Sequence, residues 1–192
     1  MVAEPLAVWH AEHVNFAGLL DLLERQVVAF GDGARPNYDL MVDIVYYLRA
    51  YSDCVHHPRE DVAFERLGAR ELAMNATISR LRQEHRVIAT AGEELLWRLN
   101  EATGDVVSPR SALEAAAATY LSYYRQHLNT EERDVMPRAA KLLTAEDWLA
   151  VAAAVPPVAD PLFGEHVEVR FTELRRQIAE QTAPVRDASQ SR

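Results

Sequence analysis

Apolar residues recur at steps of three and four along most of the chain, and this spacing constrains the fold more than any other feature. The first such stripe, between residues 6 and 30, contains Trp9, Phe16, Leu19 and Leu23. Similar stripes run through residues 38–67, 70–99 and 109–143. A period near 3.6 residues is typical of amphipathic helices that bury one face. No alternating run of the kind that marks a strand stands out, so we predict an all-α protein.

The segments between these stripes are short and rich in turn-forming residues. Residues 31–37 contain two glycines, a proline and an asparagine, and Gly68 lies near the end of the second predicted helix. Ser108-Pro109 has the order of a helix N-cap followed by a first-turn proline. Short connections favour antiparallel neighbours. We therefore predict an antiparallel up-down-up-down four-helix bundle over residues 1–143.

The C-terminal part of the chain has weaker helical signals. Thr144 resembles a new N-cap, a short helix is expected over 148–155, and Pro156-Pro157 ends it. Residues 165–178 form a last amphipathic segment. We predict that residues 144–180 are a short extra helical segment packed on the bundle, and that residues 181–192 are a flexible tail.

Composition excludes several classes of function. The 192 residues include one cysteine, Cys54, which argues against a disulfide framework and against a cysteine-rich metal site. The net charge of −9 argues against anionic partners such as nucleic acid or membrane surfaces. No secretory signal and no apolar run of about 20 residues is recognisable. We expect a cytoplasmic protein in which Cys54 is a small buried residue, and a homodimer stays an open alternative.

Histidines and acids form the pattern that points to chemistry. Two predicted helices each contain H-x-x-x-E followed by a second acid, as His56/Glu60 and His127/Glu131. A spacing of four places both side chains on one helical face. His13 and His85 add one imidazole from each remaining helix. Imidazole and carboxylate ligands without thiolate suit iron, manganese or zinc, and carboxylates that bridge favour two metal ions.

Several neighbouring residues leave the ligand set open. His57 and Asp61 form a rival register, and Pro58 could kink the helix so that both His56 and His57 face the centre. His10 shares a face with His13, and we favour a place at the rim for it. Tyr124 could ligate or donate a hydrogen bond, although most tyrosines at helical spacing are core residues. We expect His166 to be a surface residue.

These motifs resemble those of the hemerythrin-like, HHE cation-binding proteins over residues 6–143. The matching elements are Glu12-His13, His56-His57-Pro58-Arg59-Glu60-Asp61, Glu84-His85 and His127-x-x-x-Glu131-Glu132. The resemblance implies a non-haem di-iron centre with oxo or carboxylate bridges, for which zinc or manganese could substitute. It implies the ligands His13, His56, Glu60, His85, His127 and Glu131, with Glu60 and Glu131 bridging.

Three functions are compatible with these residues. The first is binding, sensing or redox reaction of a small molecule such as dioxygen, nitric oxide or hydrogen peroxide, with enzymatic turnover left open. The oxygen carriers of the family use five histidines, and a fifth is not assured here, which favours sensing, scavenging or peroxide chemistry. The second is iron storage or donation. The third is a helical interaction module with incidental histidines, using Trp148 and residues 165–178 as a surface.

Overall fold

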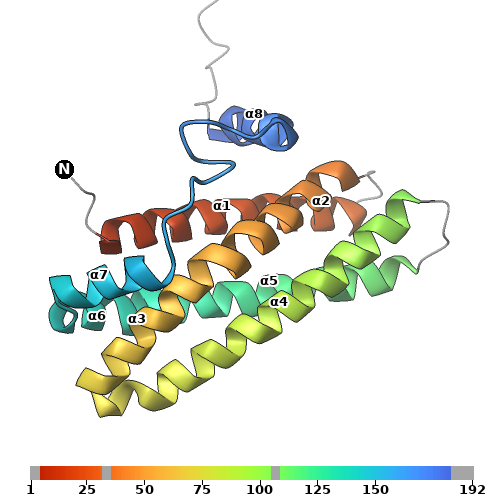
Figure 1. Ribbon diagram of the computed structural model, residues 1–192. Coiled ribbons are helices and arrows are strands. Elements are labelled where there is room, and N and C mark those ends of the chain that lie inside the picture. The colour runs from red at the N-terminus through yellow and green to blue at the C-terminus, as the bar shows by residue number, and fades with distance from the viewer. Residues whose placement is uncertain (1–4, 32–35, 105–108, 183–192) are drawn as a thin grey trace, which may run out of the picture. The chain divides into compact units, whose positions relative to one another are not determined.

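The computed structural model describes residues 5–31, 36–104 and 109–182, and these are helical without a strand (Figure 1). The prediction of an all-α protein is therefore confirmed for this part of the chain. The first two helical rods are α1 (Pro5–Gly31) and the continuous run α2 (Tyr38–Tyr47), η1 (Leu48–His56) and α3 (His57–Arg70). The next two are α4 (Asn75–Thr103) and the run α5 (Arg110–Thr130), η3 (Glu131–Val135) and α6 (Met136–Leu142).

The rods pack side by side as a helical bundle. α1 contacts α2 and α5, while α4 contacts α2, α3 and α5. The predicted stripes form the core, where Phe16, Leu20, Ile44, Leu95 and Tyr124 are fully buried. Each helix thus gains its stability from the apolar face that its sequence repeats. None of the described helices has the length and apolar character needed to cross a membrane.

Two of the rods contain a π-helical stretch directly before a proline. In η1 the last such bond runs from the His57 N–H to the Ser52 carbonyl, and in η3 it runs from the Met136 N–H to the Glu131 carbonyl. Pro58 and Pro137 come next. A proline ring clashes with the carbonyl four residues earlier in a regular α-helix, and a wider π turn relieves that clash. η1 ends at His56 and η3 begins at Glu131, so each π stretch meets one of the two H-x-x-x-E motifs.

One expectation about a single residue is confirmed and another is wrong. Gly68 lies near the end of its helix, since α3 ends at Arg70; a Cβ at Gly68 would collide with the side chain of Asn75, so the glycine permits the close turn into α4. Cys54 is exposed rather than buried, because it lies on the outer side of η1. Ser108 lies outside the described residues, and Pro109 directly precedes α5.

The short helix α7 (Ala145–Ala154) begins as predicted at Thr144, whose side chain and that of Asp147 form a reciprocal capping box. α7 packs on α3, where Asp147 pairs with Arg70 at 2.6 Å and Val151 joins the core cluster of Trp9 and Phe64. The chain divides into two compact units, Met1–Val158 and Ala159–Arg192, so α7 belongs to the bundle unit.

The second unit begins with a turn in which the backbone N–H groups of Leu162 and Phe163 donate to the Asp160 carboxylate. Its helices are η4 (Val169–Phe171) and α8 (Thr172–Thr182), so helix begins at 169 and not at 165. Most of the expected tail, residues 183–192, lies outside the described residues. The packing of the whole 144–180 segment on the bundle stays a prediction.

Candidate metal centre

Histidines and carboxylates from four rods converge inside the bundle. They form two groups of buried residues that share Glu60. Within each group, every residue has one potential ligand atom that lies within 4.8 Å of the potential ligand atoms of the others. The smaller group is His13, His56 and Glu60; the larger is His57, Glu60, His85 and His127. α1, η1, α3, α4 and α5 each contribute at least one of these side chains.

The carboxylates of Glu60 and Glu131 join the two groups. Glu60 directs Oε1 to His13 and His56 Nε2, at 3.2 and 2.7 Å, and Oε2 to His85 Nε2 at 3.3 Å. Glu131 directs Oε2 to His13 Nε2 at 3.4 Å and Oε1 to His127 Nε2 at 3.2 Å. Each carboxylate therefore offers one oxygen to each group, as a bridging ligand does.

Several inward atoms of this cluster have no hydrogen bond among the described residues. They are Glu60 Oε2, His85 Nε2, His127 Nε2 and both carboxylate oxygens of Glu131. Leaving a buried polar atom unsatisfied costs about 1–3 kcal/mol, and more for a charged group. All five are atoms that bind iron, manganese or zinc, so the residues present fit a metal centre.

Four acidic side chains, which we call the outer acids, contact the imidazole nitrogens that face away from the centre. Each faces the Nδ1 of a histidine on a neighbouring rod, and the pairs are Glu12–His56 at 2.7 Å, Asp61–His85 at 3.1 Å, Glu84–His127 at 3.3 Å and Glu132–His13 at 2.7 Å. A carboxylate on Nδ1 fixes the ring orientation and leaves Nε2 for a metal. Each of these acids is next in sequence to an inward residue of its own rod. Glu12 and Glu84 directly precede His13 and His85, while Asp61 and Glu132 directly follow Glu60 and Glu131.

In a comparison with family models, the model of the hemerythrin HHE cation binding domain matches residues 4–139. The chain belongs to this family. The match ends within α6 and leaves α7 outside it. Neither the comparison with curated proteins nor the comparison with solved structures found a match. The matched region thus contains the four rods and the buried His/Glu groups that could hold a metal.

Sequence reasoning did not predict that Glu12 and Glu84 of this HHE domain contact the Nδ1 atoms of histidines on neighbouring rods. Both directly precede an inward histidine, and neighbouring residues on a helix point about 100° apart, toward the adjacent rod. Glu12 is the more firmly held, since it also accepts hydrogen bonds from the Tyr51 hydroxyl and from Arg59 Nη2. Burial alone would raise the pKa of Glu12, but His56 and Arg59 outweigh burial and lower it.

Without a metal, the HHE centre holds protons. Burial alone would lower the pKa of His85, but the carboxylates of Asp61, Glu131 and Glu60 raise it to about 11. Burial would also lower the pKa of His127, which Glu131 and Glu84 raise to about 9. Burial would raise the pKa values of Glu60 and Glu131, yet the imidazoles around them lower both. A metal ion would take the place of these protons.

His13 is positioned by a tryptophan as well as by an acid. The indole N–H of Trp9 lies 2.8 Å from His13 Nε2, and His13 Nδ1 faces Glu132 at 2.7 Å. In the neutral ring with its proton on Nδ1, Nε2 can accept either the indole proton or a metal ion. Trp9 therefore contacts the HHE centre directly.

His57 lies inside the centre, where its ring stacks on that of His85 with centroids 4.2 Å apart. A π turn holds more residues than an α turn, so successive side chains are separated by a smaller angle, and His56 and His57 both face inward. Burial, followed by the charge of His85, holds the pKa of His57 well below its ordinary value. A neutral imidazole is the form that binds metal.

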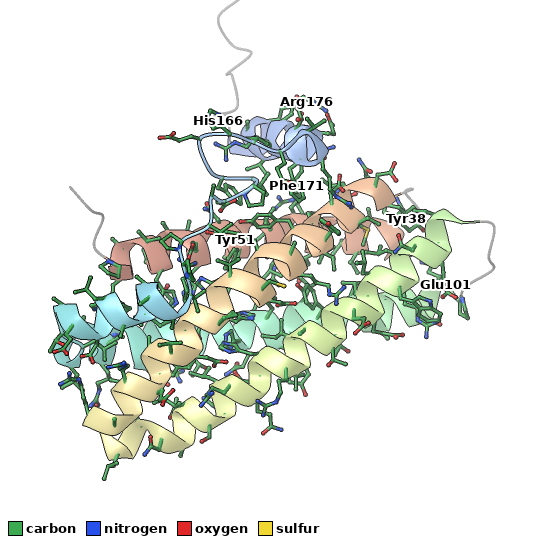
Figure 2. The ribbon with its side chains drawn as sticks, viewed as in Figure 1. Tyr38, Tyr51, Glu101, His166, Phe171 and Arg176 are labelled. Carbon is green, nitrogen blue, oxygen red and sulfur yellow. The ribbon has the colours of Figure 1, made fainter. Side chains whose placement is uncertain are left out.

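The remaining candidates lie around or away from the two groups. Asp61 contacts His85 from behind, and His10, whose side chain is 60% exposed, contacts Glu132 at the rim. The Tyr124 hydroxyl donates to Ser52 Oγ, which lies 3.2 Å from His57 Nε2; burial raises the pKa of Tyr124 well above its ordinary value. His166 belongs to the C-terminal unit and is exposed there (Figure 2).

Proposed function

We propose that this hemerythrin-family protein binds two non-haem iron ions and uses them to bind, sense or react with a small molecule, namely dioxygen, nitric oxide or hydrogen peroxide. The observation that carries the proposal is the placement of Glu60 and Glu131, each with one oxygen toward each histidine group. Carboxylates that reach both groups suit a bridged pair of ions better than one ion. Zinc and manganese are the alternative metals for the same donors.

The proposed ligand set divides unequally between the two ions. His13 and His56 would hold one ion, and His57, His85 and His127 the other, with Glu60 and Glu131 shared. The first ion thus has one imidazole fewer, and a small molecule would bind there. We place these ligands in an antiparallel up-down-up-down four-helix bundle, which the short connections between the rods support.

Iron in such a site supplies reversible one-electron redox chemistry toward dioxygen, nitric oxide or peroxide. The chain's own residues do three things for it. The outer acids orient the imidazoles and raise their basicity. Phe16 and Phe64 pack on His56 and His85 and keep bulk water away from the centre. The buried carboxylates provide negative charge that stabilises the oxidised metal.

Metal analysis tests the proposal directly. Protein purified without added metal should contain about two irons per chain and show absorption bands of a bridged di-iron centre. Glu131→Ala and His127→Ala should abolish the bands and any turnover of peroxide or nitric oxide, whereas His166→Ala should leave both intact. Protein that contains no transition metal after growth in iron-rich medium would refute the proposal.

Chelation separates redox function from iron storage or donation. Iron that resists mild chelators while the protein reacts with the small molecule supports the proposed function; iron that leaves readily without such a reaction supports donation. The cytoplasmic location and the absence of nucleic-acid and membrane partners stay predictions, and a homodimer stays an open alternative.

A further inference from the structure

An apolar pocket of about 240 Å³ lies between α1, α3 and α7 and ends at the metal centre. Val8 and Trp9 of α1 form one wall, and Trp148, Val151 and Val155 of α7 belong to the opposite wall. The inner end consists of polar side chains, including His56 and Glu60, which belong to the smaller ligand group. No role proposed above uses this pocket.

The pocket walls are held by tertiary contacts. α7 is fixed on α3 by the ion pair of Asp147 with Arg70 and by burial of Val151 beside Phe64. The rings of Trp9 and Trp148 meet edge to face with centroids 6.2 Å apart. Because α7 follows the residues that match the HHE family model, the pocket is built from the family domain and an element beyond it.

The charges at the inner end are already paired. Glu12 accepts hydrogen bonds from Arg59 Nη2 at 2.6 and 2.7 Å and faces His56 Nδ1 at 2.7 Å. The second carboxylate of the lining, Glu60, faces the Nε2 atoms of His13, His56 and His85 at 3.2, 2.7 and 3.3 Å. Both carboxylates thus already have nitrogen partners, so the pocket offers no lone charge that would attract an ion. A buried ionic occupant without a partner would pay a large desolvation cost. The chemistry of the pocket therefore selects an uncharged occupant.

The volume bounds the size of that occupant. An apolar protein cavity of about 150 Å³ stays dry and binds benzene. The present pocket is larger, and its charged or ionisable lining residues are Glu12, His56, Arg59 and Glu60. It can hold one aromatic or aliphatic ring with a small oxygen-bearing substituent directed toward the metal centre.

We propose that this pocket is a binding site for an uncharged, mainly apolar small molecule beside the metal centre. The occupant would contact Trp9, whose indole N–H donates to His13 Nε2, and would contact His56 and Glu60 at the inner end. The inference goes beyond the proposed iron chemistry and does not depend on it, because the walls and the polar end exist without a metal.

The first test uses metal-free, ¹⁵N-labelled full-length protein and 4-fluorobenzyl alcohol as the probe. We expect saturable binding with a Kd of about 1 mM or tighter, followed through the indole N–H signals of Trp9 and Trp148. Trp97 lies on α4, does not line the pocket and is 49% exposed, so its signal serves as the internal reference. Shifts that do not saturate, or that affect Trp97 as much, would overturn the proposal.

A matched pair of variants tests the location. Ala152 and Ala153 are neighbouring exposed residues of α7, but only Ala152 lines the pocket. Ala152→Phe should weaken probe binding by about tenfold or more, and Ala153→Phe should leave it within about twofold. Equal affinities for the two variants would overturn the proposal. Both variants should retain the metal content of the parent protein, so failure of the pocket and failure of the metal proposal give different results.

Charged analogues test the chemistry of the occupant. 4-Fluorobenzoate and 4-fluorobenzylammonium match the probe in size but carry opposite charges. Both should bind more weakly than the alcohol if the Glu12–Arg59 pair leaves no spare charge. Tighter binding of either ion would overturn the assignment of an uncharged occupant.

Discussion

Replacing His85 by alanine tests the central reasoning on the metal centre. The His85 side chain is 7% exposed and lies between three carboxylates, Asp61 at 3.1 Å, Glu60 at 3.3 Å and Glu131 at 3.8 Å. Glu60 and Glu131 are almost completely buried, so the substitution leaves two carboxylates short of a compensating cation. Both the metal content and the free energy of unfolding should fall.

The size of the loss follows from these contacts. Removing one partner of a buried ion pair costs about 3–5 kcal/mol. Glu60 keeps His13 and His56 as neighbours, so we expect the lower end, about 3 kcal/mol. A protein of this size loses about 2–4 °C of Tm per kcal/mol, which gives a decrease of about 6–12 °C for the metal-free form.

Thermal unfolding by circular dichroism, with metal analysis of the same samples, measures both effects. His85→Gln retains a polar side chain of similar volume and should fold more stably than His85→Ala while still binding less metal. His166→Ala is the control and should change Tm by no more than about 2 °C. If His85→Ala melts like the parent protein and contains as much metal, His85 is not part of the centre.

Three further predictions concern the protons, the outer acids and the fifth imidazole. The metal-free protein should lose stability to urea as pH rises from 6.5 toward 11. The folded state raises the pKa values of His127 to about 9 and of His85 to about 11, and the free energy of unfolding that their protonated forms contribute is lost once they deprotonate. An unfolding free energy that is constant from pH 7 to pH 10 would contradict this. Glu132→Ala should weaken metal binding by about 10–100-fold in chelator competition, since Glu132 orients His13; unchanged affinity would show that the 2.7 Å contact has no such role. His57→Ala should lower the metal content per chain while Cys54→Ala, on the outer side of the same π segment, should not; the reverse order would exclude His57 as a ligand.

Local sequence signals predicted the helices well. The stripe that includes Phe16 and Leu23 forms a buried face because residues three and four apart on a helix share that face. Thr144 begins α7 as expected, because a capping box needs only residues within one turn. Gly68 lies near the end of α3 as expected, and the close approach of the Asn75 side chain adds a reason for a glycine that the sequence did not show.

The candidate ligands were also partly visible in the sequence. His56 with Glu60 and His127 with Glu131 lie one turn apart, and that spacing alone places each pair on one helical face. For His57 the same reasoning left two positions open, an outward one on a regular α-helix and an inward one if Pro58 kinked the helix. Pro58 signalled a departure from that rotation but did not determine its form.

The sequence by itself determined that the chain is helical and that inward histidines and carboxylates recur on separate helices, since both follow from the spacing of neighbouring residues. The tertiary structure alone decided that His57 joins the centre, that each outer acid meets an imidazole on a different rod, and that α7 encloses a pocket beside Trp9. These features depend on the register between helices and on where a strained turn can widen, which only packing against the rest of the protein fixes.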